Sequence, residues 1–163
     1  MTSTIRPANN LVKAYAGVAG LVVLDQLTKQ MALAAVFTPP KIIEVLPFLN
    51  IVPVWNTGMS FGMLSDGGDL VKWGLTVLAL LVGFALPWVA RSWDSMSRFG
   101  AMLMASGAFG NAIDRIVYGA VIDFIDLFAG QYHWPAFNVA DMAVTTGAGL
   151  MILSSFLHKP QKS

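Results

Sequence analysis

The sequence predicts an all-α integral membrane protein with four transmembrane helices and a small sheet at the membrane surface. Hydrophobic residues make up 56% of the 163 residues and charged residues only 12%, against about 45–50% and about 25% in soluble domains. Four apolar runs approach the roughly 20 residues that cross a hydrocarbon core. Because no repeat or low-complexity linker divides the chain, we expect a single membrane domain over residues 1–163.

The four expected helices cover approximately residues 11–37, 70–90, 98–120 and 139–158. Only the second contains a run, Trp73 to Ala90, that is free of acidic and basic residues. A charged residue in the middle of a membrane costs about 2.5–3.5 kcal/mol on insertion scales. The other three helices carry ionisable residues, which therefore need partners or a function: Asp25, Lys29, Asp114, Arg115 and Asp141.

The basic residues beside the expected spans predict the orientation. Six of them fall on one side of the four-helix topology: Arg6, Lys13, Arg91, Arg98, Lys159 and Lys162. By the positive-inside rule both termini are cytoplasmic. The two long connections, approximately residues 38–69 and 121–138, then face outward.

The first outer connection contains two β-branched stretches, "KIIEVL" and "LNIVPVW", which are broken by Pro47 and Pro53. This pattern predicts a few short strands. "NTG" at Asn56–Gly58 predicts a turn, and "MSFGML" after it fits either a strand or a short interfacial helix. "SDGGD" predicts a loop before the second span.

Polar residues recur at helical spacing near the outer ends of the last two spans. Asn111, Asp114 and Arg115 stand at i, i+3 and i+4 and share a face, as do Asn138 and Asp141. Small residues one turn earlier, Gly107 and Gly110, would let a neighbouring helix or a substrate backbone approach closely.

Structural explanations compete with functional ones at these positions. Asn138 followed by Asp141 is typical of a helix start, with an N-cap and a favourable charge at the positive end of the dipole. Asp25 with Lys29, and Asp114 with Arg115, fit ion pairs that make insertion tolerable. Asn56 fits a turn former and the two glycines fit helix packing.

Asp123 is harder to explain structurally, because no Lys or Arg lies near it in the sequence. If its partner is Asp141, two carboxylates from the ends of adjacent helices meet at the outer membrane boundary. Like charges in contact share a proton, so one carboxylate serves as base and the other as acid. This is the chemistry of an aspartic protease. With no cysteine, no "G-x-S-x-G" and no "H-E-x-x-H", we expect neither a metal site nor a cofactor.

Four motifs together resemble the lipoprotein signal peptidase family, signal peptidase II. They are "LDQLTK" at Leu24–Lys29, "WNTGMSFG" at Trp55–Gly62, "GAFGNAIDRIVYGAVIDFID" at Gly107–Asp126 and "FNVAD" at Phe137–Asp141. They occur in family order and cover the chain except its two tails. The third motif, with its pairing to the fourth, is highly specific, whereas the first two are weak in isolation.

The resemblance implies an intramembrane aspartic endopeptidase of the bacterial cytoplasmic (inner) membrane, with its active site near the outer face. Such enzymes have four helices, an extracytoplasmic β-cradle and a helix-bearing loop over the site. They remove the signal peptide from prolipoproteins by cutting before a cysteine that carries diacylglycerol. The implied partners are these substrates, membrane lipid and inhibitors of the globomycin type, with no nucleic acid.

The resemblance also assigns residues. It implies that Asp123 and Asp141 are the catalytic dyad. The residues that bind substrate or globomycin, or that support the site, are then Asn56, Asn111, Arg115, Asn138, Asp25, Asp114 and Gly107.

Two other functions remain open from the residues alone. Four helices with a buried carboxylate such as Asp25 also describe a small proton-coupled transporter. A noncatalytic assembly factor would retain its function in an Asp123→Asn variant. An outer segment of some thirty residues and carboxylates gathered at one membrane face favour the enzyme.

Overall fold

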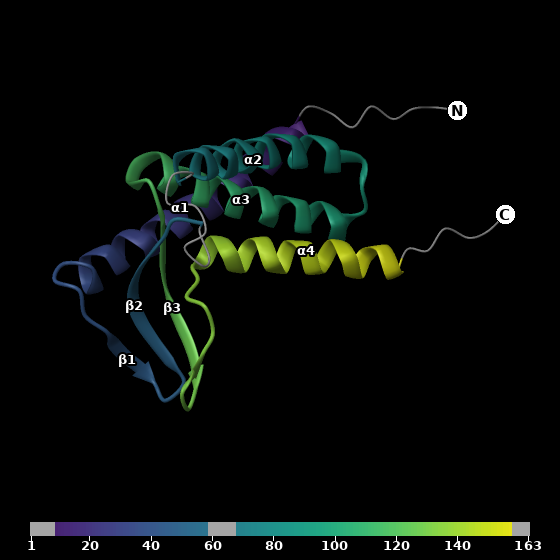
Figure 1. Ribbon diagram of the computed structural model, residues 1–163. Coiled ribbons are helices and arrows are strands. Elements are labelled where there is room, and N and C mark those ends of the chain that lie inside the picture. The colour runs from purple at the N-terminus through teal and green to yellow at the C-terminus, as the bar shows by residue number, and fades with distance from the viewer. Residues whose placement is uncertain (1–8, 59–67, 158–163) are drawn as a thin grey trace, which may run out of the picture.

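Four helices and a small sheet make up the computed structural model, which describes residues 9–58 and 68–157 (Figure 1). The helices are α1 (Asn9–Val36), α2 (Gly68–Val89), α3 (Ser95–Tyr118) and α4 (Val139–Leu157), with a short 3-10 helix, Ala90–Ser92, between α2 and α3. Helix α3 lies at the centre and packs against the other three. The expected helix bounds agree with these to within a few residues.

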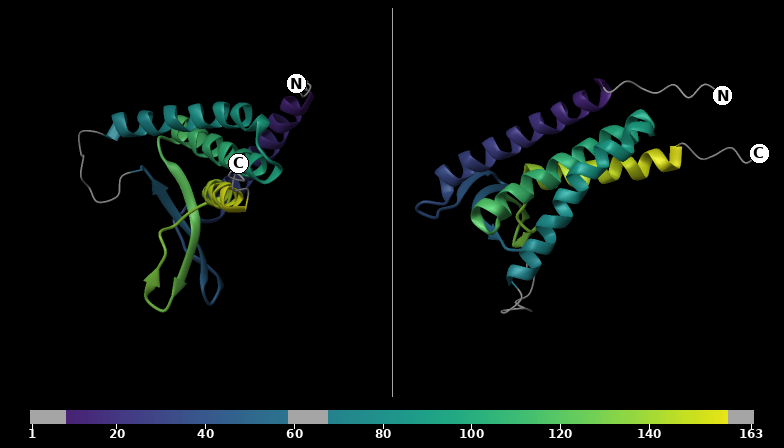
Figure 2. Two further views of the ribbon diagram at one scale, coloured as in Figure 1. Left: turned by 90° about the vertical axis from the view of Figure 1, so that its right-hand side faces the viewer. Right: turned by 90° about the horizontal axis from the view of Figure 1, so that it is seen from above.

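Three of the described helices are long and apolar enough to cross a membrane. These segments are Leu11–Val36, Gly68–Ser92 and Val139–Leu157. Helix α3 is long enough but is not among them, so the fourth expected span is not confirmed. The start of α1 and the end of α4 lie at the same end of the helices, away from the sheet (Figures 1 and 2).

Apolar side chains cover the outside of the helices, whereas several charged side chains lie inside. Leu27 and Met31 of α1, Leu81 of α2 and Leu153 of α4 are each about half exposed or more. Such a distribution suits a lipid environment, because apolar surface facing hydrocarbon costs nothing and polar groups must be satisfied within the protein.

The sheet is antiparallel, with strands β1 (Ile43–Leu46), β2 (Leu49–Asn56), β3 (Val121–Ala129) and β4 (Tyr132–His133) in sequential order. The first two confirm the strands expected from "KIIEVL" and "LNIVPVW". Between Ile51 and Val54 the pairing of β2 with β3 changes register. Pro53 lies in this interval and has no N–H to donate to a ladder. "MSFGML", most of "SDGGD" and the expected helix-bearing loop lie outside the described residues.

Strand β3 corrects one expectation, because Asp123 lies on a strand and not at the end of a helix. Helix α3 ends at Tyr118, where Gly119 adopts a left-handed φ of 77° and its N–H bonds to the Arg115 carbonyl. The β-branched run that follows then pairs with β2, with Val54 opposite Asp123 and Asn56 opposite Val121. The glycine cap therefore ends the helix and lets the chain enter the sheet at Val121, two residues before Asp123.

Close approach between α3 and α4 depends on glycines. A Cβ atom on Gly107 would collide with the Ala140 carbonyl, and one on Gly100 would lie 2.6 Å from the Gly147 carbonyl. Gly110 faces the Asp25 carboxylate instead. Small residues at these positions let α1 and α4 both contact α3 at short range.

Lys29 lies at the junction of α1 and α3 and has no exposed surface. Its Nζ is 2.9 Å from Asp25 Oδ2 and 2.8 Å from Asp114 Oδ2. The expected pair of Asp25 with Lys29 is confirmed. The expected pair of Asp114 with Arg115 is wrong, because consecutive helical residues do not face each other and Asp114 points toward α1.

We expect Lys29→Met to lower the free energy of unfolding by about 3–5 kcal/mol, because it leaves two buried carboxylates without a cation. Thermal unfolding in detergent measures the effect. Lys72→Met is the matched control: its partner Asp69 has an 87% exposed side chain, so this variant should unfold close to wild type. Equal melting temperatures for wild type and Lys29→Met would contradict a structural role for the buried cation.

Candidate active site

A backbone connection between β3 and the start of α4 brings the two candidate carboxylates together. The Phe137 N–H donates to the Ile125 carbonyl at 3.0 Å, and the Ile125 N–H donates to the Phe137 carbonyl at 2.9 Å. Asn138, the residue before α4, therefore lies directly beside the strand that carries Asp123. This pairing brings Asp123 and Asp141 close together in space although they are separated in the sequence.

Asn138 is the N-cap of α4 and contacts both carboxylates. Its backbone N–H donates to Asp141 Oδ2 at 3.1 Å, while the Asp141 N–H donates to Asn138 Oδ1 at 2.9 Å. This reciprocal arrangement is a capping box, which confirms the expected helix start. The Asn138 side-chain Nδ2 donates at 2.7 Å to Asp123 Oδ1. One asparagine thus holds Asp123 and Asp141 at the same time.

Asp123 is only 1% exposed and has two amide partners. Besides Asn138, the Nδ2 atom of Asn56 at the end of β2 donates to Asp123 Oδ2 at 2.8 Å. Burial, the largest cause, together with the nearby Asp141 carboxylate raises the pKa of Asp123 to about 6, against the hydrogen bonds from Asn56 and Asn138, which lower it. Asn56 also forms the expected turn, since its Oδ1 accepts the Gly58 N–H.

On the other side of the site, Asn111 of α3 connects Asp141 to the buried charges. Asn111 Nδ2 donates to Asp141 Oδ1 at 2.8 Å, and Lys29 Nζ donates to Asn111 Oδ1 at 3.0 Å. Lys29 in turn holds Asp25, whose Oδ1 accepts the Ala140 N–H at 2.8 Å. The cluster of Lys29, Asp25 and Asp114 therefore contacts the first turn of α4 through the Ala140 N–H.

Arg115 lies in the same region with part of its hydrogen-bonding capacity unused. Its Nη1 donates to the Asn111 carbonyl at 3.3 Å. Its Nε is buried and has no hydrogen-bond partner among the described residues. A buried donor without a partner is uncommon.

The structure thus brings together most of the residues expected from the sequence. Asn56, Asn138, Asn111 and the two carboxylates form one hydrogen-bonded set, to which Asp25 and Asp114 connect through Lys29. Gly107 lies on α3 at the contact with α4, where the absence of a side chain lets the first turn of α4 pack against α3.

Two polar residues of α1 were not expected in this set. Lys29 was predicted only as an ion-pair partner, and Gln26 was not singled out. Gln26 Nε2 donates to Asp114 Oδ1 at 2.9 Å and to the Gly110 carbonyl at 3.2 Å. The available signal was their spacing: Gln26 and Lys29 stand three residues apart in an apolar helix, so both face α3.

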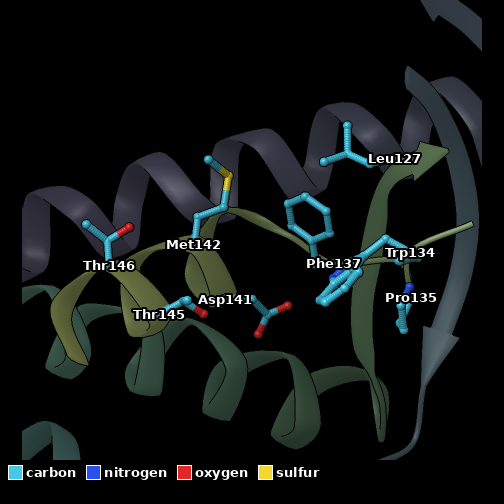
Figure 3. A pocket seen from close by; sticks show the side chains of 9 residues that line it. Leu127, Trp134, Pro135, Phe137, Asp141, Met142, Thr145 and Thr146 are labelled. Carbon is cyan, nitrogen blue, oxygen red and sulfur yellow. The ribbon is translucent and has the colours of Figure 1, made fainter. Parts of the chain in front are cut away.

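A pocket of about 480 Å³ opens beside Asp141 (Figure 3). Its walls come from Leu127 of β3, from the chain between β4 and α4 and from the first two turns of α4. Among the described residues, no group of three or more His, Cys, Asp and Glu side chains is placed to hold a metal ion.

The comparisons with known proteins agree on one family. The family model described as "Signal peptidase (SPase) II" matches residues 18–157. A lipoprotein signal peptidase of Paraburkholderia phymatum is 39% identical over 90% of both chains, and one of Hydrogenovibrio crunogenus is 43% identical over 86% of this chain and 83% of its own.

A solved structure titled as a bacterial membrane enzyme, determined at 1.9 Å resolution, superposes with a TM-score of 0.73. It is 30% identical and covers 91% of this chain and 94% of its own. The family match and these similarities extend over the helices and the sheet alike. The chain therefore belongs to the signal peptidase II family of proteases, the lipoprotein signal peptidases.

Proposed function

We propose that this protein is an intramembrane aspartic endopeptidase that removes signal peptides from prolipoproteins, and that Asp123 and Asp141 are its catalytic dyad. The cut falls before a cysteine that carries diacylglycerol. The observation that supports the dyad is the position of Asn138, which hydrogen-bonds to both carboxylates. The family relationship supports the substrate class.

The two carboxylates differ in surroundings, and this difference suggests their roles. Asp123 is buried and its pKa is raised to about 6, so it keeps its proton to a higher pH than an ordinary Asp. Asp141 is partly exposed and lies in the first turn of α4, where the positive end of the helix dipole favours a negative charge. Asp123 is therefore the acid, and Asp141 the base.

In the first step Asp141 takes a proton from a water molecule as the water oxygen attacks the scissile carbonyl. Asp123 gives its proton to the carbonyl oxygen, which produces a neutral tetrahedral intermediate. In the second step the intermediate returns a proton to Asp123 as its carbonyl reforms, and Asp141 gives its proton to the departing amine. Both carboxyl groups then regain their starting protonation states.

Neighbouring polar groups are suited to hold the substrate. Arg115 lies beside Asn111, and its guanidinium is a donor of the kind that binds a substrate carbonyl. Asn56 and Asn138 keep Asp123 in place through its two oxygens. A globomycin-type inhibitor would occupy the same donors and the same dyad.

The placement in the membrane is part of this proposal. Residues 1–163 form one domain with four spans in the bacterial inner membrane, both termini are cytoplasmic, and the dyad lies near the outer face. Support comes from the common position of the helix ends that lead to the termini (Figures 1 and 2). Arg91 and Arg98 flank the loop between α2 and α3, as the positive-inside rule requires.

A proton-coupled transporter has less support. It would need a carboxylate that is free to load and release protons inside the membrane. Asp25 is instead held by Lys29 and by the Ala140 N–H.

We expect Asp123→Asn and Asp141→Asn each to lower kcat by roughly 10²- to 10⁴-fold, because each removes one partner of the acid–base pair. The assay is cleavage of a diacylglyceryl-modified prolipoprotein peptide by purified protein in detergent, with a metal chelator present. The matched control is Asp126→Asn on the same strand, whose carboxylate pairs with Asn50 and His133 and not with the dyad. It should retain most activity.

Retention of the wild-type rate by either dyad variant would exclude the dyad mechanism. If wild type does not cut the lipidated peptide at all, the substrate assignment fails and transport assays are the next step.

We expect kcat/KM to fall above about pH 6, about tenfold for each further pH unit, as Asp123 loses its proton. The direction of this pH dependence follows from burial, which raises the pKa of Asp123 and so keeps Asp123 protonated to a higher pH. Asn56→Ala removes a hydrogen bond that lowers this pKa, so the alkaline limb should move to higher pH. A pH–rate profile of both proteins measures the apparent values of the pair. An unmoved limb would show that Asp123 does not carry the proton.

A further inference from the structure

The pocket beside Asp141 runs along α4. Met142, Thr145 and Thr146 line it at helical spacing on one face of α4, and Phe137 and Trp134 form the opposite wall. Figure 3 shows the Asp141 carboxylate between these two groups of side chains. The pocket therefore begins at the candidate dyad and follows α4 for one further turn.

The lining has little capacity for polar ligands. Within the described residues, Asp141 is the only ionisable one that lines the pocket, and the other polar side chains in its wall, apart from the Trp134 indole, are the hydroxyls of Thr145 and Thr146. Its volume of about 480 Å³ lies within the range of sites that hold drug-sized ligands. An extended peptide there would leave several N–H and C=O groups without partners, whereas a hydrocarbon chain has none to satisfy.

The pocket is also open to the surroundings of the helices. Met142 is 50% exposed and Trp134 is 69% exposed, so a ligand could enter from the side without passing through the polar set around Asn111. Met142 is a flexible apolar side chain that adapts to irregular ligands.

We propose that this pocket binds one acyl chain of the substrate's diacylglyceryl group. The proposal rests on the proposed function, because the lipid is attached to the cysteine directly after the scissile bond. A chain held along α4 starts beside Asp141 and fixes the position of that cysteine. It thereby aligns the scissile carbonyl with the dyad, and the lipid becomes a positioning element as well as a membrane anchor.

Filling the pocket tests this role. Thr145→Trp should lower kcat/KM for a substrate with long acyl chains by roughly 10- to 100-fold, because a displaced cysteine misaligns the scissile bond. A substrate with very short acyl chains should be cut at nearly the wild-type rate. Leu153→Trp is the matched control, since Leu153 is a 49% exposed residue of α4 outside the pocket. It should affect neither substrate.

A direct measurement accompanies the kinetics. A long-chain substrate with a photoactivatable diazirine on one acyl chain is bound to the Asp123→Asn variant, and crosslinks are located by mass spectrometry. Crosslinks between Trp134 and Thr146 support the proposal, and crosslinks confined to α1 or α2 overturn it.

Equal losses for long-chain and short-chain substrates in Thr145→Trp would also overturn the acyl site and indicate a peptide subsite. No loss with either substrate would overturn it as well. In both cases wild-type cleavage stays intact and the proposed function stands, whereas failure of wild type to cut either substrate refutes the proposed function itself.

Discussion

The buried cation of Lys29 is the interaction on which the arrangement of the helices depends. An ion pair inside apolar surroundings is tolerable only when the remaining lone pairs of its carboxylates are also satisfied. Here the donors are main-chain N–H groups of other elements: Ala140 of α4 donates to Asp25, and Ile122 of β3 donates to Asp114. The ion pairs of Lys29 and the N–H groups that bind its two carboxylates therefore fix α1, α3, β3 and α4 relative to one another.

The same cation determines the direction of the amide groups around the two carboxylates. Lys29 Nζ can only donate, so Asn111 presents its oxygen to Lys29 and its NH₂ group to Asp141. Asn138 accepts the Asp141 N–H through its side-chain oxygen, which leaves its NH₂ group for Asp123. Neither amide can flip without losing a donor–acceptor match. The orientation of Asp123 and Asp141 is thus a consequence of how the buried charge is neutralised.

Local spacing predicted part of this site, and long-range pairing decided the rest. The i, i+4 pair of Asp25 with Lys29 and the helix start at Asn138 follow from a single turn of helix, so the sequence was sufficient. The partner of Asp114 lies 85 residues away in α1, beyond the reach of any periodic pattern. The strand that carries Asp123 was missed for a related reason: a short apolar run fits either a helix or a strand until its partner strand is known.

Asp141 shows how a structural and a chemical role can occupy one side chain. As the third residue of α4 it completes the capping box, with Oδ2 bound to the Asn138 N–H and Oδ1 bound to Asn111. Each carboxylate oxygen has a second lone pair, so in the proposed reaction both bonds can persist while the carboxylate accepts a proton from water. The helix end stabilises the charge before the reaction. A helix cap that also holds a candidate catalytic carboxylate needs few additional residues, because the capping bonds already fix the carboxylate.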